Sequence, residues 1–164
     1  MQSGLVCAYD FCAMGNTFSG DKMLENKELL NSILKSAQMG RFGIETVMDK
    51  AVNVDLKQEL QSQKDQYDAI ENQAHQLARK RGWELQGLST PLRYMSSMMG
   101  RISVMGSDTD SKIAGMLISG NAKGLIKGVK YLNRSAKCDT QIVALAQDLV
   151  NKEQLNIQKS QPFL

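Results

Sequence analysis

The fold is decided by one stretch of this 164-residue chain, DLKQELQSQKDQYDAIENQAHQLARKRG at positions 55–82. Its apolar residues recur at steps of three and four or their sums, which places them on one face of an α-helix. Asp55 is a residue type that caps a helix N-terminus, and three basic residues before Gly82 suit the negative end of the helix dipole. The stretch therefore predicts one long helix that Gly82 terminates. Its apolar face consists of Leu56, Leu60, Tyr67, Ile70, Ala74 and Leu77.

The same period extends back to Met23 and predicts a first helix that ends at the break Asn53-Val54-Asp55. Residues 1–22 show no period, so we expect a poorly ordered arm there, followed by one bundle domain over 23–164. The apolar positions of this helix are Leu30, Ile33, Leu34, Ala37, Ile44, Met48 and Ala51.

Beyond Gly82, residues 83–90 (WELQGLST) are typical of a loop, and Thr90-Pro91 is typical of a helix start. We expect a short helix over 91–105 with a methionine-rich stripe. Methionine fills irregular gaps in a core, which is the favoured interpretation, and a surface for partners or soft metals is the alternative. The stripe consists of Met95, Met98, Met99, Ile102 and Met105.

A third long helix is predicted from Gly106-Ser107-Asp108 to about Asn133, with Ser107 and Asp110 placed as a capping box. It carries Gly120, Gly124 and Gly128 at four-residue spacing. Glycine inside a helix costs about 0.5–1 kcal/mol relative to alanine, so the stripe predicts close packing of another helix.

A fourth helix is predicted from the N-cap Asp139 to the stop at Pro162. Four long helices with short breaks predict an all-α, antiparallel four-helix bundle. The long 83–106 connection, with its short extra helix, predicts the single crossover of the ferritin-like type. The fourth helix has Ile142, Leu145, Ala146, Leu149 and Ile157 on its apolar face.

Composition limits the class of protein. Apolar residues make up 42% and charged residues 23%, which excludes a mainly disordered chain. No apolar run reaches the ~18–20 residues of a membrane span, and the N-terminus lacks the basic start of a secretory signal. The odd cysteine count predicts a reducing, cytoplasmic setting. Inert thiols are favoured over a metal or redox role for Cys7, Cys12 and Cys138.

Three segments carry a family resemblance: ELLNSILKSAQMG at 28–40, MLISGNAKGLIKG at 116–128 and LAQDLVNKEQLNIQKSQPFL at 145–164. Over residues 24–164 the chain resembles the ferritin-like superfamily, and within it small bacterial bundle proteins related to the spore coat protein F group. The resemblance implies the crossover bundle and an association with a coat.

Di-iron members of that superfamily use a Glu on two helices and Glu-x-x-His on the other two. The resemblance places Glu45 at the first-helix position, Asn72-x-x-His75 on the second helix and Glu153-x-x-Asn156 on the fourth. The third helix offers neither carboxylate nor histidine between Lys112 and Cys138. We therefore expect no di-iron centre and no cofactor.

Glu45, Glu71, His75 and Glu153 remain candidates for one vestigial metal site. Without a metal, a carboxylate near the bundle axis must be hydrogen-bonded or protonated, because an isolated buried charge is too costly.

Charge is concentrated in residues 91–138, where 8 basic residues face 2 acidic ones, a difference of +6. Lys123, Lys127, Lys130 and Arg134 form one edge of the third helix. A solvated edge whose lysine stems cover apolar surface is favoured, and a docking edge for an anionic partner such as nucleic acid is the alternative.

No catalytic or nucleotide-binding motif is present: the chain lacks G-x-S-x-G, the phosphate loop and H-E-x-x-H. We therefore expect a non-enzymatic structural or interaction protein that assembles with itself or with a protein partner. The two alternatives are a metal-binding or oxidase-type ferritin relative and a weak nucleic-acid-associated protein.

Overall fold

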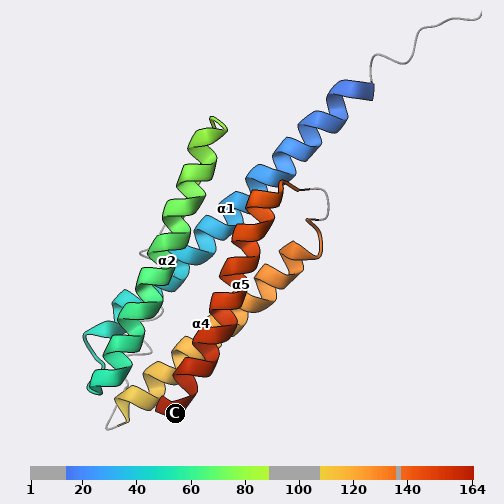
Figure 1. Ribbon diagram of the computed structural model, residues 1–164. Helices are drawn as coiled ribbons and strands as arrows, with labels where there is room; N and C mark the ends of the chain where they lie inside the picture. Colours follow the sequence, from blue (N-terminus) through green and yellow to red (C-terminus); the bar gives the residue numbers. More distant parts are fainter. Residues whose placement is uncertain (1–13, 89–107, 136–137) are drawn as a thin grey trace, which may run out of the picture.

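The computed structural model describes residues 14–88, 108–135 and 138–164, and within these ranges the chain is helical and has no strand. The four long helices lie alongside one another as a bundle (Figure 1). The predicted all-α fold is confirmed at this level, whereas the predicted helix over 91–105 and its methionine stripe lie outside the described residues. The elements are α1 (Met14–Met48), α2 (Val54–Lys80), α4 (Thr109–Leu132), α5 (Thr140–Ser160) and the 3₁₀ turn η1 (Gln161–Phe163).

Helix α1 begins at Met14, inside the segment for which the sequence predicted an arm without regular structure. The stretch from Met14 to Lys22 contains glycine, asparagine, serine and threonine, which lower helix propensity by no more than about 1 kcal/mol each. It contains no proline. Extending an existing helix avoids the cost of a new nucleus, so the weak formers join the helix that follows them.

The apolar periodicity predicted the core well. Nearly all the positions assigned to the apolar faces of the helices are buried, and Met48 and Leu77 pack partly buried against them. Fully enclosed members from three helices include Leu30, Leu34 and Ile44 of α1, Leu56, Leu60 and Ile70 of α2, and Ile142 of α5.

The ends of α2 are fixed by backbone capping. Asn53, and not the predicted Asp55, is the N-cap, because its Oδ1 accepts from the backbone N–H of Asp55 at 2.8 Å and of Leu56 at 3.1 Å. At the other end Gly82 has φ of 65°, and the N–H of Trp83 donates to the carbonyl of Ala78 at 3.0 Å. The predicted role of Gly82 in terminating this helix is confirmed.

Replacing Gly82 with alanine is expected to lower the free energy of unfolding by about 1 kcal/mol, because the new Cβ must be held in the left-handed region. No atom of residues 14–88, 108–135 or 138–164 lies within 4 Å of that Cβ position, so the cost is conformational and not steric. Urea unfolding would measure the loss. Equal stability of the two proteins would show that the turn can relax to negative φ.

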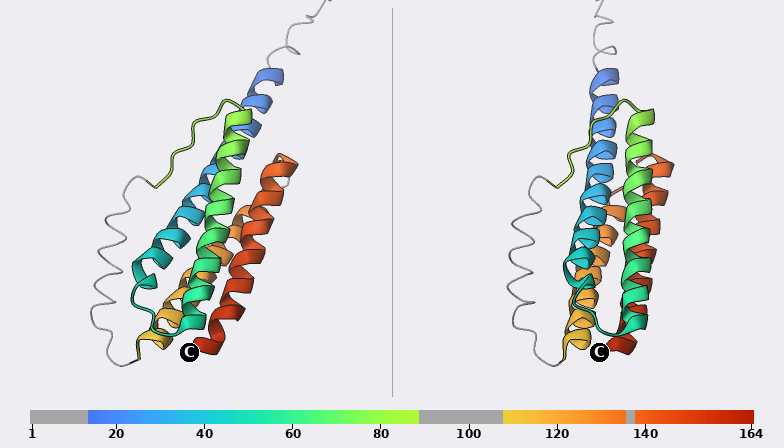
Figure 2. Two further views of the ribbon diagram at one scale, coloured as in Figure 1. Left: turned by 60° about the vertical axis from the view of Figure 1, so that its left-hand side comes forward. Right: turned by 90° about the vertical axis from the view of Figure 1, so that its left-hand side faces the viewer.

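One end of the bundle is held together by Asp110. Its carboxylate accepts from the backbone N–H of Val52 at 2.8 Å and of Asn53 at 2.9 Å, which ties the start of α4 to the turn after α1. The predicted N-cap of the capping box, Ser107, lies outside the described residues. Its other member, Asp110, is used between helices, and the N-cap of α4 is Asp108, which makes no side-chain capping bond. The chain's last residues lie at this same end, beside the start of α4 (Figure 2).

At the opposite end of the bundle, Asp139 at the start of α5 is bonded both to the end of α2 and to α1. The Arg81 guanidinium donates to Asp139 Oδ2 at 2.6 Å, and the N–H of Asp139 donates to Asn26 Oδ1 at 2.7 Å. Asp139 also accepts from the N–H of Gln141 at 2.8 Å, which confirms its predicted role as N-cap of α5.

The glycine stripe of α4 meets α5 at two of its three positions. A Cβ on Gly128 would overlap the Val150 side chain, and one on Gly124 would lie 2.6 Å from Cδ of Glu153. Among the described residues, Gly120 has no neighbour within 4 Å of its Cβ position. The predicted close packing is confirmed for Gly124 and Gly128 and is wrong for Gly120, because the stripe turns from α5 toward open space.

Candidate functional site: a cleft between α1 and α4

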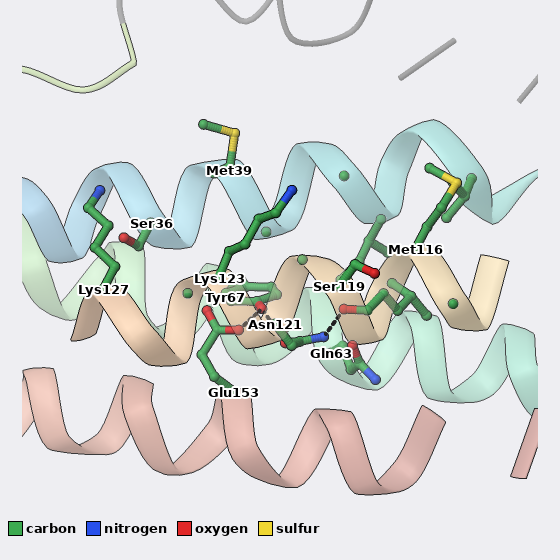
Figure 3. A pocket seen from close by; sticks show the side chains of 18 of the residues that line it. Ser36, Met39, Gln63, Tyr67, Met116, Ser119, Asn121, Lys123, Lys127 and Glu153 are labelled. Atoms are coloured by element: carbon green, nitrogen blue, oxygen red, sulfur yellow. Dashed lines mark hydrogen bonds between the residues drawn. The ribbon is translucent and has the colours of Figure 1, made fainter. Parts of the chain in front are cut away.

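A cleft of about 1020 Å³ separates α1 from α4, and residues of α2 and α5 also line it (Figure 3). We call it the α1–α4 cleft. Glycines contribute much of both walls, Gly40 and Gly43 from α1 and Gly115, Gly120 and Gly124 from α4. Glycine has no side chain, so the space beside the backbone is taken by Tyr67 at Gly40 and by Glu153 at Gly124, and it stays open among the described residues at Gly120. The apolar lining comes from Met39, Ile44, Val47, Leu88, Met116 and Leu117.

Tyr67 of α2 reaches the cleft through a gap that α1 leaves for it. A Cβ on Gly40 would overlap the Tyr67 ring, so only glycine lets the ring pack against the α1 backbone there. The Tyr67 hydroxyl lies 2.9 Å from Asn121 Oδ1 and 3.1 Å from Glu153 Oε2. Asn121 Nδ2 donates to the carbonyl of Leu117 at 2.8 Å, which fixes its Oδ1 as an acceptor (Figure 3).

Glu153 is a buried acid, with 3% of its surface exposed. Burial raises its pKa to about 8, and the hydrogen bond from Tyr67 only partly opposes this. Near neutral pH the carboxyl is therefore mostly protonated. Burial, followed by the nearby Glu153 carboxylate, also raises the pKa of Tyr67 well above its usual value, so the phenol keeps its proton.

Proton counting supports a neutral pair. One hydroxyl has a single proton, and Tyr67 cannot give it to Asn121 and Glu153 at once. When the carboxyl is protonated, Glu153 donates to the phenol oxygen while Tyr67 donates to Asn121. Each of the three groups then has a partner, and no charge lies at the bottom of the cleft.

Gln63, also on α2, adds an unpaired acceptor to the cleft lining. Its side chain is fully buried, and its Nε2 donates to Glu59 Oε1 at 2.9 Å and to Ser160 Oγ at 3.3 Å. Within the described part of the chain, its Oε1 has no hydrogen-bond partner. A buried acceptor without a donor carries a desolvation cost of about 1–3 kcal/mol, which a bound donor would relieve.

Four lysines also line the cleft: Lys35 of α1 and Lys112, Lys123 and Lys127 of α4. None of them belongs to an ion pair formed among residues 14–88, 108–135 and 138–164. The Lys127 ammonium lies 5.9 Å from the centroid of the Tyr131 ring. The acidic residue of the lining is Glu153, mostly neutral near pH 7, so the cleft is positively charged.

The predicted basic edge of α4 is exposed over its whole length, and the structure divides it in two. Lys123 and Lys127 line the α1–α4 cleft, whereas Lys130 and Arg134 lie outside its lining. The two halves have the same charge and differ in what they face. They therefore form a matched pair for experiment.

The four candidate metal ligands are not brought together. The Arg41 guanidinium lies 3.0 Å from Glu45 Oε1 and 3.4 Å from Glu71 Oε2, so it supplies the positive charge that those carboxylates need. His75 Nε2 lies 3.8 Å from Glu71 Oε1, while Glu153 interacts with Tyr67. No group of three possible ligands converges within the described residues, and these side chains do not fit a di-iron centre.

Sequence reasoning missed three residues of this site. Tyr67 was assigned to the apolar face, and Gln63 and Asn121 were not singled out. A signal was present for Gln63, because it falls at core spacing between Leu60 and Tyr67, and a polar residue at a core position often has a function. Of the cysteines, Cys138 is half-buried, and Cys7 and Cys12 lie outside the described residues.

Comparison of the chain with models of protein families, with curated proteins and with solved structures finds no match. Within the described ranges, no helix has an apolar segment long enough to cross a membrane.

Proposed function

We propose that this protein is a non-enzymatic interaction protein, built on an antiparallel, ferritin-like four-helix bundle, that takes up an anionic partner in the α1–α4 cleft. One observation carries the proposal: in the part of the chain that the structure describes, four lysines that form no ion pair there line a cleft whose acidic residue, Glu153, is mostly neutral. Fixed positive charge without a counter-charge attracts anions and speeds their encounter with the site.

The ferritin-like part of the proposal is supported by contacts at the bundle ends. The end of α1 and the starts of α2 and α4 meet through Asp110, and α5 ends nearby (Figure 2). In this arrangement α2 and α4 run one way, and α1 and α5 run the other. Ferritin-like bundles, with their one long crossover, have these helix directions.

A binding role is favoured over catalysis by the chemistry of the lining. Among the described residues, the lining has neither histidine nor cysteine, and its carboxyl is engaged by Tyr67. Its serines, Ser36 and Ser119, share that described lining with no histidine that could act as their general base. Nucleophilic catalysis requires an activating partner within hydrogen-bond reach.

Titration with 8-anilinonaphthalene-1-sulfonate, an anion with an apolar body, tests the proposal. We expect saturable binding of one dye per chain, with enhanced fluorescence that weakens as salt is added. Gly120→Leu should reduce the affinity at least about tenfold, because a side chain placed there enters cleft space that no atom of the described residues occupies within 4 Å of the Cβ position.

The matched control is Leu155→Ser on α5, which removes an apolar side chain that is 44% exposed and lies outside the cleft lining. It should leave the affinity for the dye unchanged. If the dye binds Gly120→Leu as tightly as it binds the wild type, the cleft is not the binding site and the proposed function is wrong.

A further inference from the structure

We infer that the partner taken up by the α1–α4 cleft is a small amphipathic organic anion, with an anionic head at the lysines, an apolar chain, and a hydrogen-bond donor at its inner end. This inference rests on the proposed function and specifies the ligand class. Three independent features of the cleft carry it: its size, the separation of its charged and apolar lining, and the unpaired Gln63 acceptor.

The size of the cleft favours a small molecule over a polymer. Its volume is about 1020 Å³, at the upper end of the range of roughly 300–1,000 Å³ for small-molecule sites. Its lining includes residues with less than 5% exposure, Ile44, Tyr67 and Glu153, which a nucleic-acid backbone or a folded protein surface could not reach.

Charge favours an anionic head at the exposed lysines. Lys112, Lys123 and Lys127 are exposed, so a carboxylate, phosphate or sulfonate can pair with them while keeping part of its hydration. Figure 3 shows Lys123 and Lys127 on α4, the helix that forms one wall. An anion placed deeper would lie near the Glu153 carboxyl, in surroundings where burial already disfavours the charged form of that carboxyl.

The deeper lining favours an apolar chain. Ile44, Val47 and Leu117 are buried side chains that line the cleft, and half-buried Met39 and Met116 add flexible thioether groups to it. Methionine adapts to ligands of varied shape, so this lining suits a flexible alkyl or ring system more than a single rigid ligand.

Gln63 specifies the inner end of the ligand. Its Nε2 is already used by Glu59 and Ser160, so its free Oε1 can serve a ligand only as an acceptor. The matching ligand group is a donor such as a hydroxyl. A chain that ends in a methyl group would leave this acceptor unpaired and would bind less tightly.

The inference is tested by displacing the bound dye with compounds that share a ten-carbon chain and differ in the groups at its ends. We expect decanoate to bind at least about tenfold more tightly than decanol, and decyltrimethylammonium to bind most weakly of the three, because of the lysines. Placing a hydroxyl at the far end, in 10-hydroxydecanoate, should tighten binding by roughly two- to tenfold relative to decanoate.

Two pairs of variants locate the ends of the ligand. Lys123→Glu with Lys127→Glu should weaken decanoate at least about tenfold, whereas Lys130→Glu with Arg134→Glu makes the same charge change on α4 outside the cleft and should have little effect. Gln63→Leu should abolish the preference for 10-hydroxydecanoate over decanoate. That preference is a ratio within one variant, so a general loss of affinity leaves it interpretable.

Failure of the inference is distinguishable from failure of the proposed function. Equal affinity for decanol, decanoate and decyltrimethylammonium would overturn the anionic head, and equal affinity of the two acids in the wild type would overturn the inner donor. If single-stranded DNA displaces the dye and decanoate does not, the ligand class is wrong while the anion-binding function stands. If the dye itself does not bind, both are wrong.

Discussion

Replacing Gly124 with leucine lowers the free energy of unfolding by about 1–3 kcal/mol, the usual cost of overpacking. The α4 backbone at Gly124 lies against the Glu153 carboxyl, and a Cβ would be 2.6 Å from its Cδ. Leucine would force α4 from α5 or displace the buried carboxyl from Tyr67. Thermal and urea unfolding would measure the loss.

Gly120→Leu is the matched control for this experiment. It makes the same substitution one turn earlier on the same helix, where no atom of the described ranges lies within 4 Å of the Cβ position. Leucine is the better helix former, so this variant should gain about 0.5–1 kcal/mol. A gain in stability for Gly124→Leu as well would show that Gly124 is not in close contact with α5.

The helices could be predicted from sequence because their signals are local. Apolar residues at three- and four-residue steps marked the buried faces of α1, α2 and α5, and Gly82 and Asp139 marked ends that the structure confirms. The start of α1 and the role of Asp110 were wrong because they depend on neighbours. Asp110 has the sequence of a cap, but the turn at Val52 and Asn53 competes for its carboxylate.

The cleft was much harder to predict, because it is a property of two helices that are distant in sequence. Gly40 and Gly124 each make room for a side chain of another helix, Tyr67 and Glu153, and no spacing within one segment shows such a pairing. The glycine stripe indicated close packing and gave no sign that Gly120 faces open space. The basic edge was recognised, but only the structure separates Lys123 and Lys127 from Lys130 and Arg134.

The metal hypothesis shows how composition can mislead when partners are unknown. Glu45 and Glu71 are carboxylates on two neighbouring helices, as a ferritin-like ligand set requires. The structure adds Arg41, whose guanidinium lies within 3.4 Å of a carboxylate oxygen of each. A guanidinium group in this place balances the carboxylate charges as a bound metal ion would. Acidic residues at ligand positions therefore do not by themselves indicate a metal.

The second large expected effect is on the pH dependence of the free energy of unfolding, and it comes from the buried Glu153 carboxyl. Its pKa is about 8 in the folded protein and 4.5 without that environment. Between these values the folded state holds a proton that the unfolded state has lost. The free energy of unfolding therefore falls as pH rises through this window, by up to about 1.4 kcal/mol per pH unit, and the stabilisation is fully present only below pH ~4.5.

Glu153→Gln is expected to remove this slope, because an amide keeps the shape of the protonated acid and cannot ionise. The two proteins should differ little near pH 5, and the variant should be the more stable by several kcal/mol near pH 9. Urea unfolding at pH 5, 7 and 9 compares them, and titrating groups that do not interact with Glu153 contribute equally to both. Parallel stability profiles would mean that Glu153 ionises normally in the folded protein. The bottom of the cleft would then be charged, and the neutral Tyr67–Glu153 pair would be wrong.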